Sequence, residues 1–150
     1  MIDYQKILDK NLINVFKDIL NYIKKNGLGN KNYIYITFLT NNKLVKMPNW
    51  LKKKYPTEMT IIIQYEYYDI QIFDDYFSII LSFDDIKTKL EIDFNAIISF
   101  ADPSSNFGLK LNGFADKKNI DKVNIDKVLE NKDNHSKENV VEFANYKKLT

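Results

Sequence analysis

The sequence predicts an α+β fold, in which an N-terminal helix packs on a small, strongly bent antiparallel β-sheet or partly open barrel. A disordered C-terminal tail is expected to follow. Apolar residues recur at three- and four-residue spacing over residues 4–25, the period of one helix face. From residue 33 to about residue 100, short runs of β-branched and aromatic residues alternate with turn residues. After Gly113, polar and charged residues dominate.

The composition suits one folded domain with residues left over. Of the 150 residues, 45% are hydrophobic and 14% aromatic. The net charge of +2 and the pI near 8.5 are too mildly basic to suggest a nucleic-acid-binding protein. The absence of cysteine excludes disulfides and thiolate metal sites. No stretch resembles a signal peptide or a membrane span, so we expect a soluble, cytoplasmic protein.

The N-terminal helix carries signals at both ends. Asp3 can accept hydrogen bonds from the free amides of the first turn. Lys24 and Lys25 complement the helix dipole, and Gly27 can adopt the left-handed conformation that ends a helix. Because the apolar face is wide enough to cover both a sheet and a second molecule, we expect a homodimer through this helix. The residues predicted for the dimer interface are Leu8, Leu12, Phe16 and Ile19.

The middle of the chain predicts several strands and one helical turn. Strands are expected over residues 33–40, 43–47, 59–65, 68–73, 77–83 and 88–94, and residues 95–100 are expected to turn once and add a final strand at an edge. Residues 48–55 suit a helical turn between two prolines. Asp74-Asp75 and Asp84-Asp85 are expected at turns, because Asp tolerates tight-turn backbone angles.

The chain is therefore expected to divide into a folded domain (1–112), a flexible linker (113–139) and a terminal segment (140–150). The linker contains a tandem five-residue repeat, a period that fits neither a helix nor a strand face. Apolar residues then return over residues 140–148. An apolar end on a polar tail is typical of a docking peptide.

Catalytic chemistry finds little support in the sequence. The one histidine, His135, lies in the predicted linker, where no scaffold would hold it against a partner. Ser104 and Ser105 have neither a histidine nor a lysine beside them, and the paired aspartates are typical of solvated turns. We expect no enzyme activity, no cofactor and no metal site.

Two binding functions remain open on the residues alone. Lys52, Lys53 and Lys54 lie between Trp50 and Tyr55, which combines charge with stacking surface and allows a small RNA-binding barrel as an alternative. Acidic residues on the strands disfavour that reading.

Peptide binding is the other candidate. Residues 64–69 end one strand and begin the next, and they offer an amide and several tyrosine rings. Such groups bind peptide backbones and side chains, although Tyr67 and Tyr68 would equally well fill the core at a strand bend.

Several separated motifs resemble the stringent starvation protein B (SspB) family. They are Tyr35-Ile-Thr-Phe38, Tyr55-Pro-Thr-Glu-Met-Thr-Ile-Ile-Ile-Gln64 and Phe100-Ala-Asp-Pro-Ser104 followed by Phe107-Gly108. The resemblance runs from about residue 2 to residue 111. It implies a small Sm-like barrel, dimeric through its N-terminal helix, that binds the ssrA degradation tag of stalled translation products. It also implies an adaptor without catalytic activity.

The resemblance assigns roles to individual residues. Gln64 matches a strand-end glutamine implicated in tag binding, and Tyr65, Tyr67 and Tyr68 are candidates for the groove wall by position. The terminal segment is similar to the family's docking peptide for the N-terminal zinc-binding domain of ClpX, the unfoldase of the ClpXP protease. Its predicted docking residues are Val140, Val141, Phe143, Tyr146, Lys147 and Lys148. The chain departs from the family at Phe83-Asp84-Asp85, where many members have Phe-Gly-Gly.

Overall fold

The computed structural model describes residues 1–29, 31–111 and 140–141. The helices are α1 (Tyr4–Asn26) and α2 (Asn49–Lys54), with single 3₁₀ turns η1 (Phe94–Ala96) and η2 (Pro103–Ser105). The strands are β1 (Ile34–Leu39), β2 (Glu58–Ile63), β3 (Tyr67–Ile72), β4 (Tyr76–Phe83), β5 (Ile86–Asp93), β6 (Ile97–Asp102), β7 (Phe107–Lys110) and β8 (Val140–Val141). The predicted linker lies outside the described residues, as do residues 142–150 of the terminal segment.

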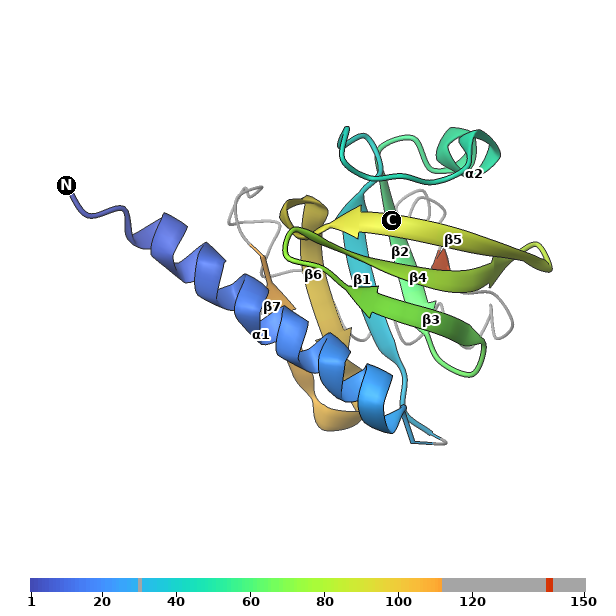
Figure 1. The fold of residues 1–150 in the computed structure, drawn as a ribbon, viewed down its shortest axis with the longest axis horizontal. Coiled ribbons are helices and arrows are strands. Elements are labelled where there is room, and N and C mark those ends of the chain that lie inside the picture. Colours follow the sequence, from blue (N-terminus) through green and yellow to red (C-terminus); the bar gives the residue numbers. More distant parts are fainter. Residues whose placement is uncertain (30, 112–139, 142–150) are drawn as a thin grey trace, which may run out of the picture.

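The strands divide between two antiparallel sheets and do not close into a barrel. One sheet has the order β7-β6-β1-β2-β8 and the other the order β3-β4-β5. Figure 1 shows the two sheets one in front of the other, with α1 running past one end of both. The chain leaves the five-stranded sheet over residues 64–66 and returns to it through η1. The predicted α+β class is thus confirmed, with two sheets in place of one bent sheet.

Helix α1 is capped by Asp3 at its start and by Gly27 at its end. The Asp3 carboxylate accepts a hydrogen bond from the Lys6 backbone N–H at 3.0 Å, which satisfies one free donor of the first turn. Gly27 has the expected positive φ, +73°, but its ψ of −179° is extended and differs from the left-handed helical conformation that the sequence predicts; it donates its N–H to the Ile23 carbonyl at 2.8 Å. The Lys24 ammonium then ties the helix end to β3 by donating to Gln71 Oε1 at 3.0 Å.

The main core lies between the sheets and α1. Phe16 of α1 is its centre, because its ring lies 5.9 Å from that of Phe77, 6.1 Å from that of Phe94 and 5.7 Å from that of Phe100. These three partners come from β4, η1 and β6. One side chain of the helix therefore joins both sheets.

Two local predictions fail. Residues 43–47 form no strand; within them Lys46 alone makes an isolated bridge, exchanging backbone hydrogen bonds of 2.9 and 3.0 Å with Glu91. Pro48, two residues on, has no N–H and prevents the ladder from continuing. Strand β6 is not at an edge, because β7 pairs along its other side, from Asp102↔Phe107 to Ser99↔Lys110.

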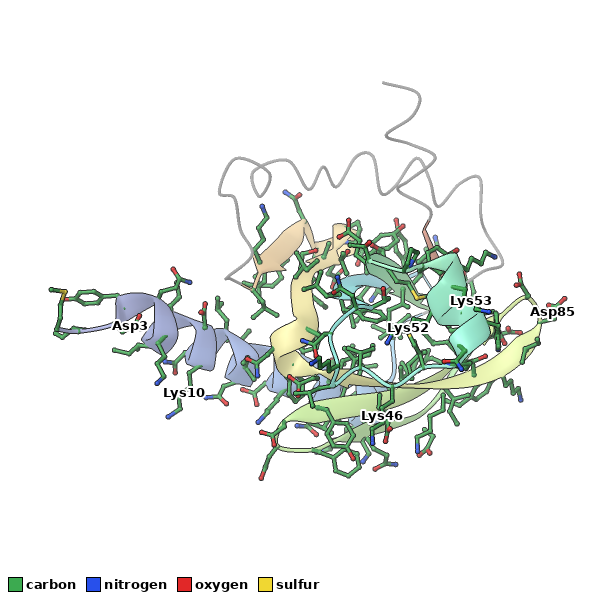
Figure 2. All side chains as sticks on the ribbon, turned by 90° about the horizontal axis from the view of Figure 1, so that it is seen from above. Asp3, Lys10, Lys46, Lys52, Lys53 and Asp85 are labelled. Atoms are coloured by element: carbon green, nitrogen blue, oxygen red, sulfur yellow. The ribbon has the colours of Figure 1, made fainter. Side chains whose placement is uncertain are left out.

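The predicted Asp84-Asp85 turn has an unusual backbone. Both residues have positive φ, +51° and +62°, and they connect the paired residues Phe83 and Ile86. Positive φ at both central residues is the geometry of a type I′ turn, which matches the twist of a two-residue hairpin and favours Gly or Asn. Figure 2 shows Asp85 at the far tip of this hairpin, away from the core.

Candidate functional site

The candidate peptide site begins where β2 ends and the chain changes sheets. Ile63, the last residue of β2, is fully buried, Gln64 is half-buried, and Tyr65 is 72% exposed. The exposed fraction of the side chain thus rises from 0% at Ile63 to 72% at Tyr65, two residues later. The position leaves the Gln64 amide at the boundary between core and surface, beside the last backbone groups of β2.

The three predicted tyrosines have different environments. Tyr67 packs against the main core, and its hydroxyl accepts the Leu28 backbone N–H at 3.1 Å, so it holds β3 to the end of α1. Tyr68 is 40% exposed, with the Lys87 ammonium 4.5 Å from its ring centroid. Tyr65 and Tyr68 therefore offer accessible rings, whereas Tyr67 serves the fold.

The edge of β2 is occupied by the far end of the chain. Strand β8 pairs with it antiparallel, in the register Thr60↔Val141 and Ile61↔Val140. Val140 and Val141 are the first two predicted ClpX-docking residues. The remaining four, Phe143, Tyr146, Lys147 and Lys148, lie outside the described residues. The sequence did not predict this strand, because two residues are too few to show the alternation of apolar and polar positions that marks a strand.

The predicted dimer residues are divided between surface and core. Leu8 is 52% exposed, Leu12 and Ile19 pack partly against the core, and Phe16 has no exposed surface. This placement removes Phe16 from any contact with a second chain, because its ring is enclosed by the protomer's own core. Further apolar side chains of α1 are exposed: Tyr4, Ile7, Val15 and Tyr22. Figures 1 and 2 show the N-terminal half of α1, with Asp3 and Lys10, projecting beyond the sheets.

Of the three lysines of α2, Lys54 contacts another element of the fold. All three lie in its last turn, where positive charge complements the helix dipole. Lys54 lies 3.6 Å from the Asp84 carboxylate and so links α2 to the β4–β5 hairpin. Figure 2 places Lys52 and Lys53 on the same short helix. Nothing in this arrangement adds to the case for RNA binding.

The loop serines lie in a capped turn. Ser104 Oγ donates to Asp102 Oδ1 at 2.6 Å, and the Ser105 backbone N–H donates to the same oxygen at 3.3 Å. His135 lies outside the described residues. Within the part of the chain that the structure describes, no three His, Cys, Asp or Glu side chains are grouped to hold a metal ion. The same residues include no helix with the length and apolar character that crossing a membrane requires.

Together, the long capped helix and the two antiparallel sheets define a small α+β protein in which the β2 edge pairs with an extended segment of the same chain. The stringent starvation protein B family matches residues 7–147, and the chain belongs to that family. Membership supports a role as a protease adaptor in general. A search of the curated proteins found no match to the chain.

Proposed function

We propose that this protein is a non-enzymatic adaptor that binds ssrA-type degradation tags and tethers tagged proteins to the ClpXP protease. Family membership supports the adaptor role. The observation that carries the tag-binding half is the edge of β2, which accepts an extended antiparallel segment and ends beside Gln64. A degradation tag is a peptide that can bind in an extended form, and a strand edge binds such peptides through main-chain hydrogen bonds.

Gln64 and the exposed tyrosines would supply the side-chain part of recognition. An amide group both donates and accepts, so Gln64 can satisfy one N–H and one C=O of a bound backbone. Its half-buried position limits the freedom that binding must remove. Tyr65 and Tyr68 add apolar surface with little rotamer entropy to lose.

The terminal segment would supply the tether, binding the N-terminal zinc-binding domain of ClpX. Val140, Val141 and Phe143 would bury apolar area there, Tyr146 would add an aromatic anchor, and Lys147-Lys148 would steer the peptide to an acidic rim. A random coil of the length of residues 113–139 spans roughly 25–30 Å. Tethers of that reach give effective concentrations on the order of millimolar, so weak contacts suffice.

A homodimer through α1 would double the number of tethers. The exposed apolar side chains of the projecting helix, Leu8 among them, are the surface that supports this part of the proposal. Two terminal segments acting on one protease complex would raise avidity without any new contact.

Tag binding is tested with a fluorescent ssrA-tag peptide and the Gln64→Ala variant. Losing the amide's hydrogen bonds should cost about 1–2 kcal/mol, or roughly 5- to 30-fold in Kd. Gln5→Ala is the matched control, because Gln5 is an exposed helix residue whose amide donates to Asp9 of the same helix. Equal affinity in Gln64→Ala and wild type removes Gln64 from the site, and no affinity in the wild type defeats the tag-binding proposal.

Tethering is tested by deleting residues 139–150. The shortened protein should still bind the tag peptide but should no longer stimulate ClpXP degradation of a tagged substrate. The measurement is the degradation rate at a substrate concentration below KM. If the shortened protein stimulates degradation as strongly as the full protein, the terminal segment is not the tether and that part of the proposal is wrong.

A further inference from the structure

The connection between β1 and β2, residues 40–57, is positively charged throughout. It contains no aspartate or glutamate. Its five lysines are Lys43, Lys46, Lys52, Lys53 and Lys54. Like charges on neighbouring residues repel one another, so a cluster of one sign attracts a partner of the other sign.

One of these five lysines is paired within the fold. Lys54 lies 3.6 Å from the Asp84 carboxylate. Among the residues that the structure describes, no carboxylate forms a salt bridge with the other four. Three of the four are exposed and Lys52 is half-buried. Figure 2 looks onto the side of the molecule that carries α2 and shows Lys46, Lys52 and Lys53 there. This side therefore presents positive charge to solvent.

An aromatic ring is exposed beside these lysines. Trp50 is 39% exposed, whereas the next residue, Leu51, is 1% exposed and anchors α2 in the main core. Trp50 and Lys53 lie three residues apart on α2, so the ring and the ammonium group share one face of the helix. Tryptophan is among the residues that contribute most to binding at protein interfaces.

A second apolar side chain is exposed just before α2. Leu44 is 61% exposed, whereas Val45 is 4% exposed. Asn42 fixes this turn, because its side-chain oxygen accepts the Leu44 N–H at 2.8 Å and its backbone carbonyl accepts the Val45 N–H at 3.1 Å. The fold thus holds Leu44 outward while it buries the next residue.

We propose that this surface binds an acidic segment of a partner polypeptide, in which aspartates or glutamates flank an apolar side chain. The surface, called the α2 patch, consists of Leu44, Trp50, Lys43, Lys46, Lys52 and Lys53. Trp50 and Leu44 would cover the apolar side chain of the partner, and the lysines would pair with the carboxylates around it. An apolar centre with a charged rim is the usual anatomy of a protein interface. Exposed ion pairs are individually weak, so the lysines would set the association rate and the selectivity, and Trp50 would supply most of the affinity.

The surroundings of the α2 patch favour a polypeptide over a nucleic acid. A nucleic-acid backbone requires a continuous track of positive charge and aromatic rings on which bases stack. Asp84 and Asp85 form the hairpin tip that Lys54 contacts, and their carboxylates would interrupt such a track. Leu44 offers an aliphatic side chain, on which bases do not stack. A peptide segment needs only a few charges and gains from both apolar side chains.

The α2 patch and the candidate tag site lie at opposite ends of β2. Lys54, the last residue of α2, precedes the first residue of β2 by four positions, whereas Gln64 follows the last residue of β2. At about 3.4 Å per residue, this strand separates the two sites by roughly 20 Å. Both sites can therefore be occupied at once. Binding at the α2 patch requires neither a tag nor Gln64, and it holds whether or not the protein is a tag adaptor.

A designed acidic peptide tests the α2 patch on the full-length protein. The probe is a short peptide in which glutamates flank a central phenylalanine and leucine. We expect saturable binding of the fluorescein-labelled peptide by anisotropy. Trp50 is the only tryptophan of the chain, so its emission should shift to the blue when the unlabelled peptide covers its ring. A peptide with glutamine in place of glutamate should bind at least about 10-fold more weakly. No saturable binding of the acidic peptide below about 1 mM overturns the proposal.

Substitutions locate the binding. Trp50→Ala should weaken peptide binding roughly 5- to 30-fold, and Trp50→Phe, which keeps an aromatic ring, roughly 2-fold. The double substitution Lys46→Glu with Lys53→Glu should weaken binding more than about 10-fold and remove its increase at low salt. The matched control makes the same change at Lys10 and Lys31, two exposed lysines outside the α2 patch. It has the same net charge and should stay within about 2-fold of wild type. Equal losses in the two double variants show that net charge alone attracts the peptide, which overturns the proposal.

Two further probes separate the α2 patch from other binding functions. A single-stranded uridine oligonucleotide should bind more weakly than the acidic peptide at physiological salt; tighter binding of the oligonucleotide makes the surface a nucleic-acid site and the proposal wrong. Trp50→Ala should keep the affinity of wild type for the ssrA-tag peptide, and Gln64→Ala should keep its affinity for the acidic peptide. If Gln64→Ala loses the acidic peptide and Trp50→Ala does not, the peptide binds at the tag site and the α2 patch is refuted. Absence of tag affinity in the wild type defeats the proposed function alone, because binding of the acidic peptide is measured without a tag.

Discussion

Replacing Phe16 with alanine should destabilise the protomer by about 3–5 kcal/mol, the usual range for removing a buried phenylalanine. The ring has no exposed surface and lies within 5.7–6.1 Å of three other aromatic rings. Each such pair contributes about 0.5–1.5 kcal/mol beyond area burial. The three partners also come from both sheets and from the η1 turn between them, so the cavity cannot be closed by shifting one of them. The loss is a large share of the roughly 5–15 kcal/mol that stabilises a domain of this size.

Urea unfolding followed by circular dichroism measures this loss, at two protein concentrations so that protomer stability is separated from association. Phe16→Leu, which keeps most of the volume, should cost roughly 1–2 kcal/mol and remains measurable if the alanine variant fails to fold. Leu8→Ala is the control on the same helix. It should change protomer stability by less than about 0.5 kcal/mol but weaken self-association in sedimentation experiments. If Leu8→Ala costs as much stability as Phe16→Ala, α1 is not divided into a core half and a surface half as described.

Two backbone substitutions should shift stability in opposite directions. Gly27→Ala should lower the free energy of unfolding by about 1–3 kcal/mol in urea titrations, because φ +73° with ψ −179° is a region that glycine alone adopts readily. Gly29→Ala is its control, since Gly29 has no positive φ and its added methyl would meet only the end of the Asn32 side chain; equal losses in both would contradict the backbone explanation. Asp85→Gly should raise the melting temperature by about 2–6 °C, because it relieves a positive φ worth roughly 0.5–1 kcal/mol. Asp84→Gly should gain less, because it also loses the contact with Lys54, and a fall in melting temperature for Asp85→Gly would show that the turn is not strained.

Local signals in the sequence predicted local structure well. Asp3 and Gly27 act within one turn of the helix, so their effects on its ends could be read without knowing the rest of the fold. The Asp84-Asp85 turn is equally local, since it depends on the backbone angles of two residues. The helix prediction ended one residue before the observed end at Asn26.

Pairing between distant strands could not be predicted in the same way. A period of two indicates a strand but not its neighbours, so one bent sheet and two stacked sheets fit the same pattern. Strand β7 was missed because four residues including Gly108, none of them fully buried, give no alternation of buried and exposed positions. The pattern also could not show that Tyr67 points into the core while Tyr68 stays half-exposed, since either face of β3 was free to be the buried one.

The order of strands in the five-stranded sheet also determines which strand pairs can form while the chain is being synthesised. Strand β1 pairs with β6, and Ala101 follows its partner Tyr35 by 66 residues. Apart from the isolated bridge between Lys46 and Glu91, the strands β3, β4 and β5 pair with neighbours along the chain, so this three-stranded meander can form while the ribosome is still translating. The pair of strands β1 and β2, which α2 separates along the chain, must wait with one apolar edge of β1 unpaired until residue 102 has left the exit tunnel. A translational pause before that point would prolong the exposure of this unpaired apolar edge, which favours aggregation.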